Sequence, residues 1–360
     1  MQYVIDRSKL QAFDIILTRE KSKRSKAIRG ISVGDYSHAL ICLDNSSLIE
    51  ATIEGRVFTE NAQRLIFDKI EDCKVLRFKN TLTKDQKEKM NYFLRTQIGN
   101  RYSIKEAIKI PLFSRTIKTA DDGQFCSRLV AQAYQCASIN LVINPNYCTP
   151  ENLNSSEFLN NVPNMVRIAT SEDIEICERP SQIKENQIQT YIWLDRVAEL
   201  AKKENFKIHT QSDVDSFLLK YPSYDEEVCT YIRETTYLKQ YKQDEVIHPF
   251  RYKFDSRGTV NIAQEFSMNF SVIERHSSNY LACKKNYEST NLCYCSMLKD
   301  LYANMLKQCY QRLDVLEEYI EIDIKLSNDA DYTHYLLNIL IKIKRLQIQV
   351  KSTLGEYEIS

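Results

Sequence analysis

The chain of 360 residues is 43% hydrophobic and 27% charged, a composition that is typical of a folded globular protein and excludes a disordered or fibrous one. Its 49 basic and 48 acidic side chains leave a formal net charge of +1, so no overall field would hold nucleic acid or an anionic membrane. The seven glycines include no GxGxxG or GxxxxGK(S/T) pattern, which argues against a nucleotide-binding loop. We therefore expect no nucleic-acid partner.

The first residues, 1–7, lack the basic stretch and apolar run of an export signal. No apolar stretch approaches the roughly 18 residues that a membrane span needs. The eleven cysteines are odd in number, and Cys42, Cys73, Cys136 and Cys309 each lie in an apolar periodic segment. We expect a cytoplasmic protein without a transmembrane segment, in which most cysteines are reduced thiols of the core.

The region up to about residue 80 is expected to be rich in β-structure. Short apolar runs bounded by turn or charged residues predict strands at 13–18, 38–43, 48–52 and 73–78. From Thr83 the pattern becomes helical, with a capped start and apolar residues at helical spacing until Gly99. A second helix is expected to begin near Cys126.

An acidic and polar segment at 171–187, with Pro180 in its middle, separates this mixed region from a long stretch without clear strands. We place a domain boundary there, which gives a first domain at 1–180 and a mainly α-helical domain at 181–360. Helical patterns cover 188–202, 213–219, 225–241, 301–320 and 336–354. The last pattern also contains a strand-like alternation, but its helical face is longer, so we expect a helix.

One cysteine has a context unlike the other ten. Cys126 follows the polar, glycine-containing loop 121–125 and stands in the first turn of the expected helix. The unpaired N–H groups and the positive end of the helix dipole favour a thiolate at that position. We therefore expect Cys126 to be a nucleophile.

A nucleophilic cysteine needs an imidazole within hydrogen-bonding reach. Of the five histidines only His38 lies in the first half, on the expected strand 38–43, where a buried ring needs a polar partner. Glu50, on the next expected strand, is a lone carboxylate that can orient the ring. A two-residue turn would place it on the opposite face, whereas a three-residue loop, 44–46, pairs Leu40 with Glu50 and leaves Glu50 diagonal to His38. We expect the three-residue loop.

Three further residues are candidates for contacts with the substrate or with an oxyanion. Tyr36 stands two residues before His38, on the same strand face, where its hydroxyl could contact the oxyanion or its ring could simply pack. The other two candidates are Tyr102, in the segment 97–102, and Gln124, in the loop directly before Cys126.

Two other clusters favour less specific interpretations. Cys283, Cys293, Cys295 and Cys309 lie near His276, but their only close pair is a C-x-C, which lacks the gap of common zinc sites, so core thiols are expected and no metal or cofactor. The basic run 19–26 suits either an anionic partner or a solvated surface, and solvated surfaces are commoner.

Five segments together resemble the YiiX/YaeF-like permuted papain-fold hydrolases, relatives of the NlpC-type amidases and the lecithin:retinol acyltransferase-like enzymes. They are residues 13–19, 36–39, 48–51, 97–102 and 125–130, and the segment 148–153 is similar to the closing Thr-Pro segment of that family. The resemblance covers about residues 10–165. It implies an α+β fold in which a papain-like antiparallel sheet packs on helices, with Cys126 as nucleophile, His38 as base and Glu50 as the orienting residue.

We expect a cysteine hydrolase of the amidase or thiol-protease kind that forms an acyl-enzyme at Cys126, with an amide or isopeptide as substrate and a protein among the candidate partners. A lipid ester hydrolase or acyltransferase is the first alternative. The second is a non-catalytic interaction protein that acts through its helical half. The sequence does not settle the substrate, the role of residues 181–360 or the oligomeric state.

Overall fold

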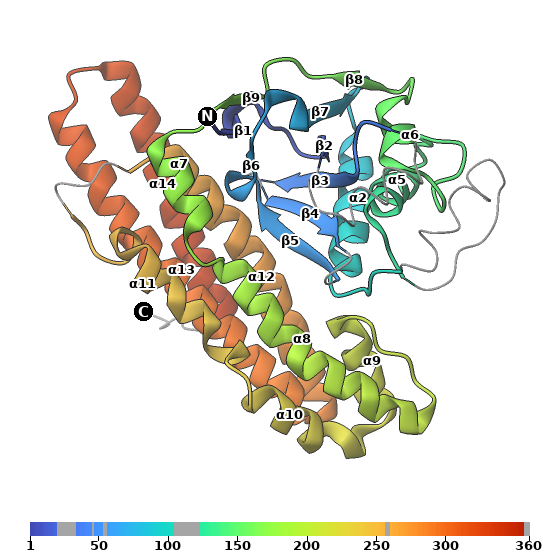
Figure 1. Ribbon diagram of the computed structural model, residues 1–360. Coiled ribbons are helices and arrows are strands. Elements are labelled where there is room, and N and C mark those ends of the chain that lie inside the picture. Colours follow the sequence, from blue (N-terminus) through green and yellow to red (C-terminus); the bar gives the residue numbers. More distant parts are fainter. Residues whose placement is uncertain (20–33, 45–46, 53–55, 104–122, 256–259, 356–360) are drawn as a thin grey trace. The chain divides into compact units, whose positions relative to one another are not determined.

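A computed structural model describes residues 1–19, 34–44, 47–52, 56–103, 123–255 and 260–355 (Figure 1). The chain divides into two compact units: the first comprises Met1–Leu194 and Lys207–Asp213, and the second comprises Asp195–Phe206 and Val214–Ser360. The first unit contains two antiparallel sheets and several helices, and the second is mostly helical. The fold is therefore α+β.

Six antiparallel strands form the main sheet of the first unit, in the order β5-β4-β3-β2-β7-β8. They are β2 (Ile15–Thr18), β3 (His38–Asp44), β4 (Ser47–Ala51), β5 (Val57–Asn61), β7 (Cys73–Phe78) and β8 (Leu159–Asn161). A second antiparallel sheet, in the order β6-β1-β9, consists of β1 (Tyr3–Ile5), β6 (Ile66–Phe67) and β9 (Val166–Ile168). The four strands predicted from the sequence are confirmed to within two residues.

The helices of the first unit include both of those expected there. They are α2 (Lys84–Gln97), α5 (Cys126–Gln135), α6 (Pro150–Asn154) and α7 (Ser171–Glu178), with short 3-10 turns η1 (Arg7–Lys9), η2 (Ala62–Arg64) and η3 (Ile70–Asp72). Helix α2 begins with a capping box: the Gln86 N–H donates to Thr83 Oγ1 at 3.2 Å, and the Thr83 N–H donates to Gln86 Oε1 at 2.9 Å. The capped start predicted at Thr83 is confirmed.

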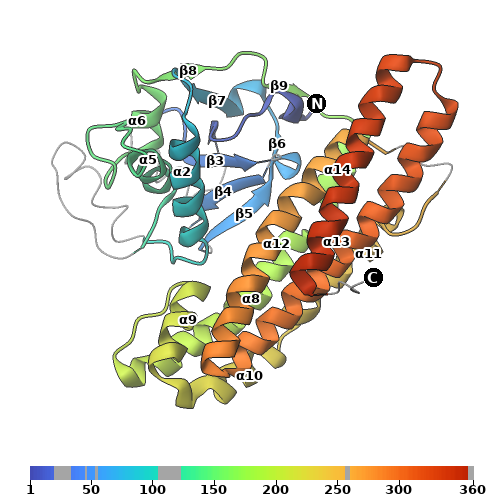
Figure 2. The ribbon, with the colours of Figure 1, turned by 180° about the vertical axis from the view of Figure 1, so that it is seen from behind.

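The two faces of the main sheet bury different partners, because side chains alternate along each strand. Leu17 and Ile41 belong to a core that they share with α2 and α5. Their strand neighbours Ile16 and Leu40 belong to a second core, shared with Ile5 of the smaller sheet. Figure 2 shows α2 and α5 beside the strands of the main sheet. This layering packs α2 and α5 against the face of the main sheet that carries Leu17 and Ile41.

The hairpin between β3 and β4 has the predicted register but not the predicted loop. Ile41 pairs with Ile49 and Cys42 with Leu48, which sets Leu40 opposite Glu50 and leaves Glu50 diagonal to His38. The three-residue loop was wrong, because Asp44 pairs with Ser47 and only residues 45–46, outside the described residues, connect the strands. A β-bulge between Cys42 and Asp44 supplies the extra residue instead.

The segment 171–187, in which the sequence suggested a boundary, is largely helical. It is occupied by α7 and by the start of α8 (Gln182–Ala201), with Pro180 between them. Arg64 holds the end of α7 by donating to the carbonyl oxygens of Ile176 and Cys177 at 2.8 and 3.3 Å. The polar side chains of this segment are thus those of an exposed helical surface rather than of an irregular linker.

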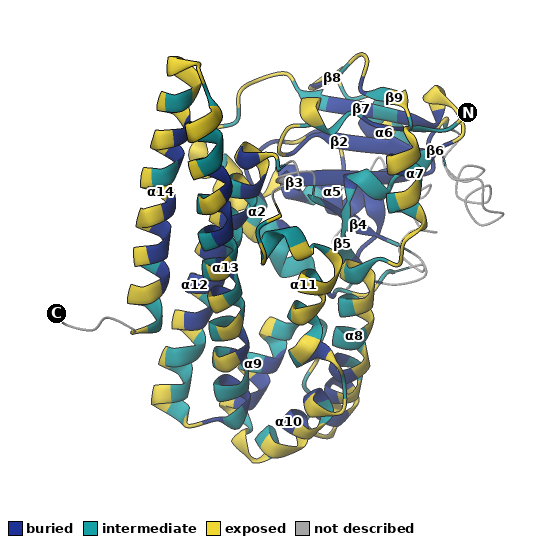
Figure 3. Cartoon of the chain, turned by 90° about the vertical axis from the view of Figure 1, so that its left-hand side faces the viewer, coloured by how far each residue is buried: buried dark blue, intermediate teal, exposed yellow. Residues whose placement is uncertain are grey.

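The second unit consists mainly of long helices. Its elements, with α9 beginning in the first unit, are η4 (Lys202–Glu204), α9 (Gln211–Lys220), η5 (Pro222–Tyr224), α10 (Asp225–Arg233), η6 (Tyr237–Lys242), α11 (Gln243–Ile247), η7 (Pro249–Arg251), α12 (Ile262–Thr290), α13 (Cys293–Leu326) and α14 (Ala330–Leu354). The helix predicted at 225–241 is broken after α10, and α12 had not been expected. In α14, Leu336, Ile343 and Val350 are buried whereas Ile341 is 53% exposed, so the helical interpretation is confirmed (Figure 3).

Asp244 forms the centre of a polar cluster inside the second unit. Its carboxylate accepts hydrogen bonds from Arg251 at 3.0 Å, from Arg312 at 3.1 Å and from the Tyr252 hydroxyl at 2.6 Å. His248 lies 2.9 Å from the same carboxylate. Burial raises the pKa of Asp244, but these partners outweigh burial and hold that pKa well below its usual range.

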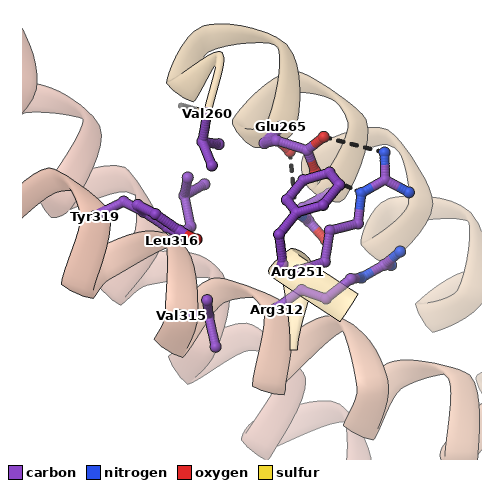
Figure 4. Close-up of a pocket in the computed structure, with 9 residues that line it drawn as sticks. Arg251, Val260, Glu265, Arg312, Val315, Leu316 and Tyr319 are labelled. Carbon is purple, nitrogen blue, oxygen red and sulfur yellow. Dashed lines mark hydrogen bonds and ion pairs between the residues drawn. The ribbon is translucent and has the colours of Figure 1, made fainter. Parts of the chain in front are cut away.

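A small cavity adjoins this cluster, between η7, α12 and α13 (Figure 4). Arg251 closes one side through two hydrogen bonds to Glu265, each 3.0 Å long. The free volume is about 10 Å³, which is room for roughly one water molecule. The buried atoms Asn269 Oδ1 and Arg312 Nε have no hydrogen-bonding partner in the described part of the chain.

All eleven cysteines are free thiols. Seven of them are buried, as expected for core thiols, but Cys136, which was also expected in the core, is exposed at the end of α5.

Among the described residues, no helix combines the length and the hydrophobicity that crossing a membrane would require.

Candidate active site

Cys126 is the first residue of α5 and is 5% exposed. Phe125, at the N-cap, has an extended backbone (φ −142°, ψ 164°) and provides no side-chain cap. The first N–H groups of an α-helix have no partner within the helix, and the positive end of the helix dipole lies beside them. The thiol of Cys126 therefore stands where backbone N–H groups can stabilise negative charge.

His38 and Glu50 meet across the β3–β4 pair. Nε2 of His38 lies 2.5 Å from Oε2 of Glu50, and each residue is 8% exposed. A carboxylate can only accept, so the proton of this bond belongs to Nε2. The bond orients the imidazole and leaves Nδ1 for a second partner.

Cys126 lies close enough to His38 for its charge and a hydrogen bond to affect the pKa of the ring. Burial lowers the pKa of His38, but the charge of Cys126 and the hydrogen bonds from Cys126 and Glu50 outweigh burial and raise this pKa well above its usual value. The three predicted catalytic residues are thus brought together, with His38 between the thiol and the carboxylate.

The segment after α5 folds back onto its first turn. Ser127 Oγ donates to the Cys148 carbonyl oxygen at 2.7 Å, and the Cys148 thiol donates to the Ser127 carbonyl oxygen at 3.3 Å. Burial, with a contribution from the charge of Cys126, raises the pKa of Cys148 to about 12. Cys148 is therefore a protonated structural thiol, and Cys126 is the one held beside an imidazole.

Tyr36 was expected on the strand, but it lies just before β3. It is 8% exposed, packs in the core that contains Cys126, and has the Arg19 guanidinium 5.4 Å from its ring centre. Burial raises the pKa of its hydroxyl. The contacts are those of a packed aromatic residue, and a role towards an oxyanion stays a prediction.

Gln124 is buried, and its carboxamide is directed at other side chains of the protein. Its Nε2 donates to Gln97 Oε1 and to Gln132 Oε1, both at 2.8 Å, and its backbone pairs with Tyr102. Both donor hydrogens are thus used in tying the loop before Cys126 to α2 and α5. Tyr102 is half-buried against the same core. The Oε1 atom of Gln124 is buried and has no hydrogen-bonding partner in the described part of the chain, and a contact of Gln124 with the substrate or an oxyanion stays a prediction.

Two sequence features fall partly outside the described residues. The basic run 19–26 is described only at Arg19, which forms an ion pair with Asp35 at 3.0 Å. The loop before the nucleophile is described from Gly123 onward. Among the described residues, no group of three or more His, Cys, Asp or Glu side chains is arranged to hold a metal ion.

Sequence reasoning assigned no role to Arg128, two residues after the nucleophile. Arg128 is 1% exposed, and its guanidinium contacts the segment before α5 and the segment after it. The available signal was a charged residue directly before the mostly apolar stretch 129–134 of an amphipathic helix. Such a residue is rarely fully buried without a specific partner.

Comparisons with known proteins yield little for this chain. No model of a known protein family matches it, and no curated protein matches it. One solved structure that this chain matches weakly is that of a metalloprotein, yiiX, from Escherichia coli O157:H7, at 21% identity and a TM-score of 0.33. The match covers 42% of this chain and 96% of that one.

Proposed function

We propose that the chain is a cysteine hydrolase that cleaves an amide or isopeptide bond through an acyl-enzyme at Cys126. The observation that carries the proposal is the continuous contact from Glu50 through His38 to a cysteine at an uncapped helix start. A nucleophile, a base and an orienting acceptor in this order are the parts that acyl transfer requires. A permuted papain-like arrangement, with the His strand before the Cys helix, belongs to the same proposal.

Each step uses groups of the site. His38 takes the proton of the Cys126 thiol, and the thiolate sulfur attacks the carbonyl carbon of the substrate. Backbone N–H groups at the start of α5 stabilise the negative oxygen of the tetrahedral intermediate. The C–N bond then breaks while His38 returns the proton to the departing nitrogen. Water, deprotonated by His38, hydrolyses the thioester and regenerates the thiol.

The experiment is acylation of the full chain with p-nitrophenyl acetate, followed by peptide mass spectrometry that locates the acetyl group. We expect the group on Cys126 of the wild type and its loss in Cys126→Ala. Cys136→Ala is a matched control, because Cys136 is an exposed thiol on the same helix that lacks the imidazole. A thiol that is labelled merely because it is exposed would be Cys136, and preferential acetylation there would overturn the proposal.

A second measurement identifies the kind of bond that the protein cleaves. Peptide amides, isopeptide-linked peptides and phospholipid esters are offered to the wild type and to Cys126→Ala, and release of the amine or fatty acid is measured. Turnover of an amide that depends on Cys126 supports the proposal. Turnover confined to lipid esters, or transfer of their acyl group to an added amine, would replace it with the esterase or acyltransferase alternative.

A further inference from the structure

Arg128 lies in the first turn of α5, two residues after Cys126, and is 1% exposed. We infer that it is a positioning residue for the proposed reaction, whose guanidinium holds the backbone entering Cys126 in the orientation that acyl transfer needs. The inference rests on the proposed function and adds a residue that the proton and acyl transfers do not themselves use.

Two hydrogen bonds connect Arg128 to both segments that flank the start of α5. Its Nη1 donates to the Gly123 carbonyl oxygen at 2.8 Å, and its Nε donates to the Asn146 carbonyl oxygen at 2.8 Å. Gly123 is three residues before the nucleophile, and Asn146 lies in the segment that folds back onto the first turn. Because the guanidinium is rigid and planar, it fixes these two carbonyl groups relative to one another.

Two aromatic rings hold the guanidinium itself. The guanidinium carbon lies 4.5 Å from the ring centre of Phe125 and 5.2 Å from that of Tyr147. Such contacts favour the delocalised charge of an arginine over the compact ammonium of a lysine. Phe125 is also the N-cap residue of α5, so the same contact orients the peptide that leads into Cys126.

The opposite side of this backbone has little room to move. Gly123 has φ +120°, and a Cβ placed on it would lie 2.7 Å from Cβ of Ser103. The path from Gly123 to Cys126 is thus held between Arg128 and Ser103. Its direction sets where the first N–H groups of α5 point, and a displacement of about 1 Å between reacting groups can cost roughly a hundredfold in rate.

Two reagents distinguish an effect on the orientation of the oxyanion donors from an effect on the reactivity of the Cys126 thiol. Iodoacetamide alkylates a thiolate by displacement and needs no oxyanion donors, whereas acylation by p-nitrophenyl acetate proceeds through an oxyanion. In Arg128→Lys we expect the alkylation rate of Cys126 and its pH profile to stay within about twofold of wild type, while the acylation rate falls by about tenfold or more. Arg77→Lys is the matched control, since Arg77 contacts Asp14 and the Lys9 carbonyl oxygen, and it should leave both rates unchanged.

Three results would decide against the inference. An acylation rate in Arg128→Lys equal to that of wild type would show that the contacts of Arg128 do not matter. A parallel fall of both rates with a shifted alkylation profile would mean that Arg128 affects the reactivity of the Cys126 thiol and not the orientation of the oxyanion donors. Absence of acylation at Cys126 in the wild type would instead overturn the proposed function, and the role of Arg128 with it. If circular dichroism shows that Arg128→Lys does not fold, Tyr147→Leu loosens the same guanidinium and should show the same difference between the two reagents.

Discussion

His38 and Glu50 lie diagonally across two antiparallel strands, and their side chains meet at 2.5 Å between Nε2 and Oε2. Both are almost fully buried, so solvent scarcely competes for the bond. The imidazole consequently has one nitrogen occupied and the other available to Cys126. The chemistry proposed for the site depends on this bond as much as on the thiol.

The titration of His38 gives the first prediction. Cys126 and Glu50 raise its pKa, so in the folded protein its ring should titrate well above the usual value of about 6.5. Glu50→Gln removes a charge that favours the imidazolium and should move the titration to lower pH. Cys126→Ala should do the same. NMR of ring-labelled histidine measures both shifts, and His38→Gln assigns the signal. A ring that titrates at or below 6.5 in the wild type contradicts the arrangement.

The same pair predicts a graded loss of activity. His38→Ala removes the base and should lower the acylation rate of Cys126 by about 10⁴-fold. Glu50→Gln keeps an acceptor for the imidazole but loses its charge, so we expect a smaller fall, of about 10- to 100-fold. The measurement is the acylation rate with p-nitrophenyl acetate, with thermal unfolding as the check on folding. Equal losses in the two variants would mean that Glu50 does more than orient the ring.

Gly123→Ala should destabilise the first unit and slow acylation together. The backbone there has φ +120°, and the added methyl carbon would lie 2.7 Å from Cβ of Ser103, so strain of about 1–3 kcal/mol is expected. Gly355→Ala is the control, because its φ is +75° but no atom lies within 4 Å of the added carbon. Urea unfolding should show a larger loss for Gly123→Ala. Equal losses would show that the contact with Ser103 relaxes freely.

His276 predicts how acid affects the second unit. Burial, with the charges of Arg275 and Arg312, lowers the pKa of His276 to about 3. The unfolded chain binds this proton near pH 6.5 and the folded chain does not, so stability is full above pH 6.5 and falls as the pH drops towards 3. The slope contributed by this group should approach about 1.4 kcal/mol per pH unit.

His276→Phe tests that slope, because it keeps a ring beside Tyr302 and removes the titrating group. Between pH 6 and pH 4.5 the urea-unfolding free energy of the variant should depend less on pH than that of the wild type. The exposed His334 offers the control: His334→Gln should retain the wild-type slope. A wild-type slope in His276→Phe would mean that another group causes the acid sensitivity.

The candidate site was predictable because its signals are local. A cysteine after a polar loop, at the first residue of an amphipathic helix, is visible within ten residues, and so is a histidine at the start of an apolar strand. Glu50 needed the hairpin register, which was chosen so that Glu50 could reach His38; the structure has that register although the predicted loop length was wrong. The role of Arg128 was not predictable, because its partners are the carbonyl oxygens of Gly123 and Asn146. Every residue has a backbone carbonyl group, so the sequence does not indicate which of them accept hydrogen bonds.

The missed elements have similarly physical causes. The strands of the smaller sheet have two or three residues each, too few for an alternation to be recognised. Helix α12 buries Glu265, Asn269 and His276 among its apolar residues, so its inward face does not read as an apolar stripe. Glu265 meets its partner, Arg251, on another element, which a one-dimensional pattern cannot show.

Because of the bulge between Cys42 and Asp44, the candidate site depends on whether the number of residues between His38 and Glu50 is odd or even. Because side chains alternate with a period of two, removing one residue from the hairpin would exchange the faces of β4 and carry the Glu50 carboxylate away from the His38 ring. Removing two residues would preserve the face. Insertions and deletions in this hairpin are therefore tolerable only two residues at a time. This restriction concerns the number of residues and not the identity of any residue in the loop.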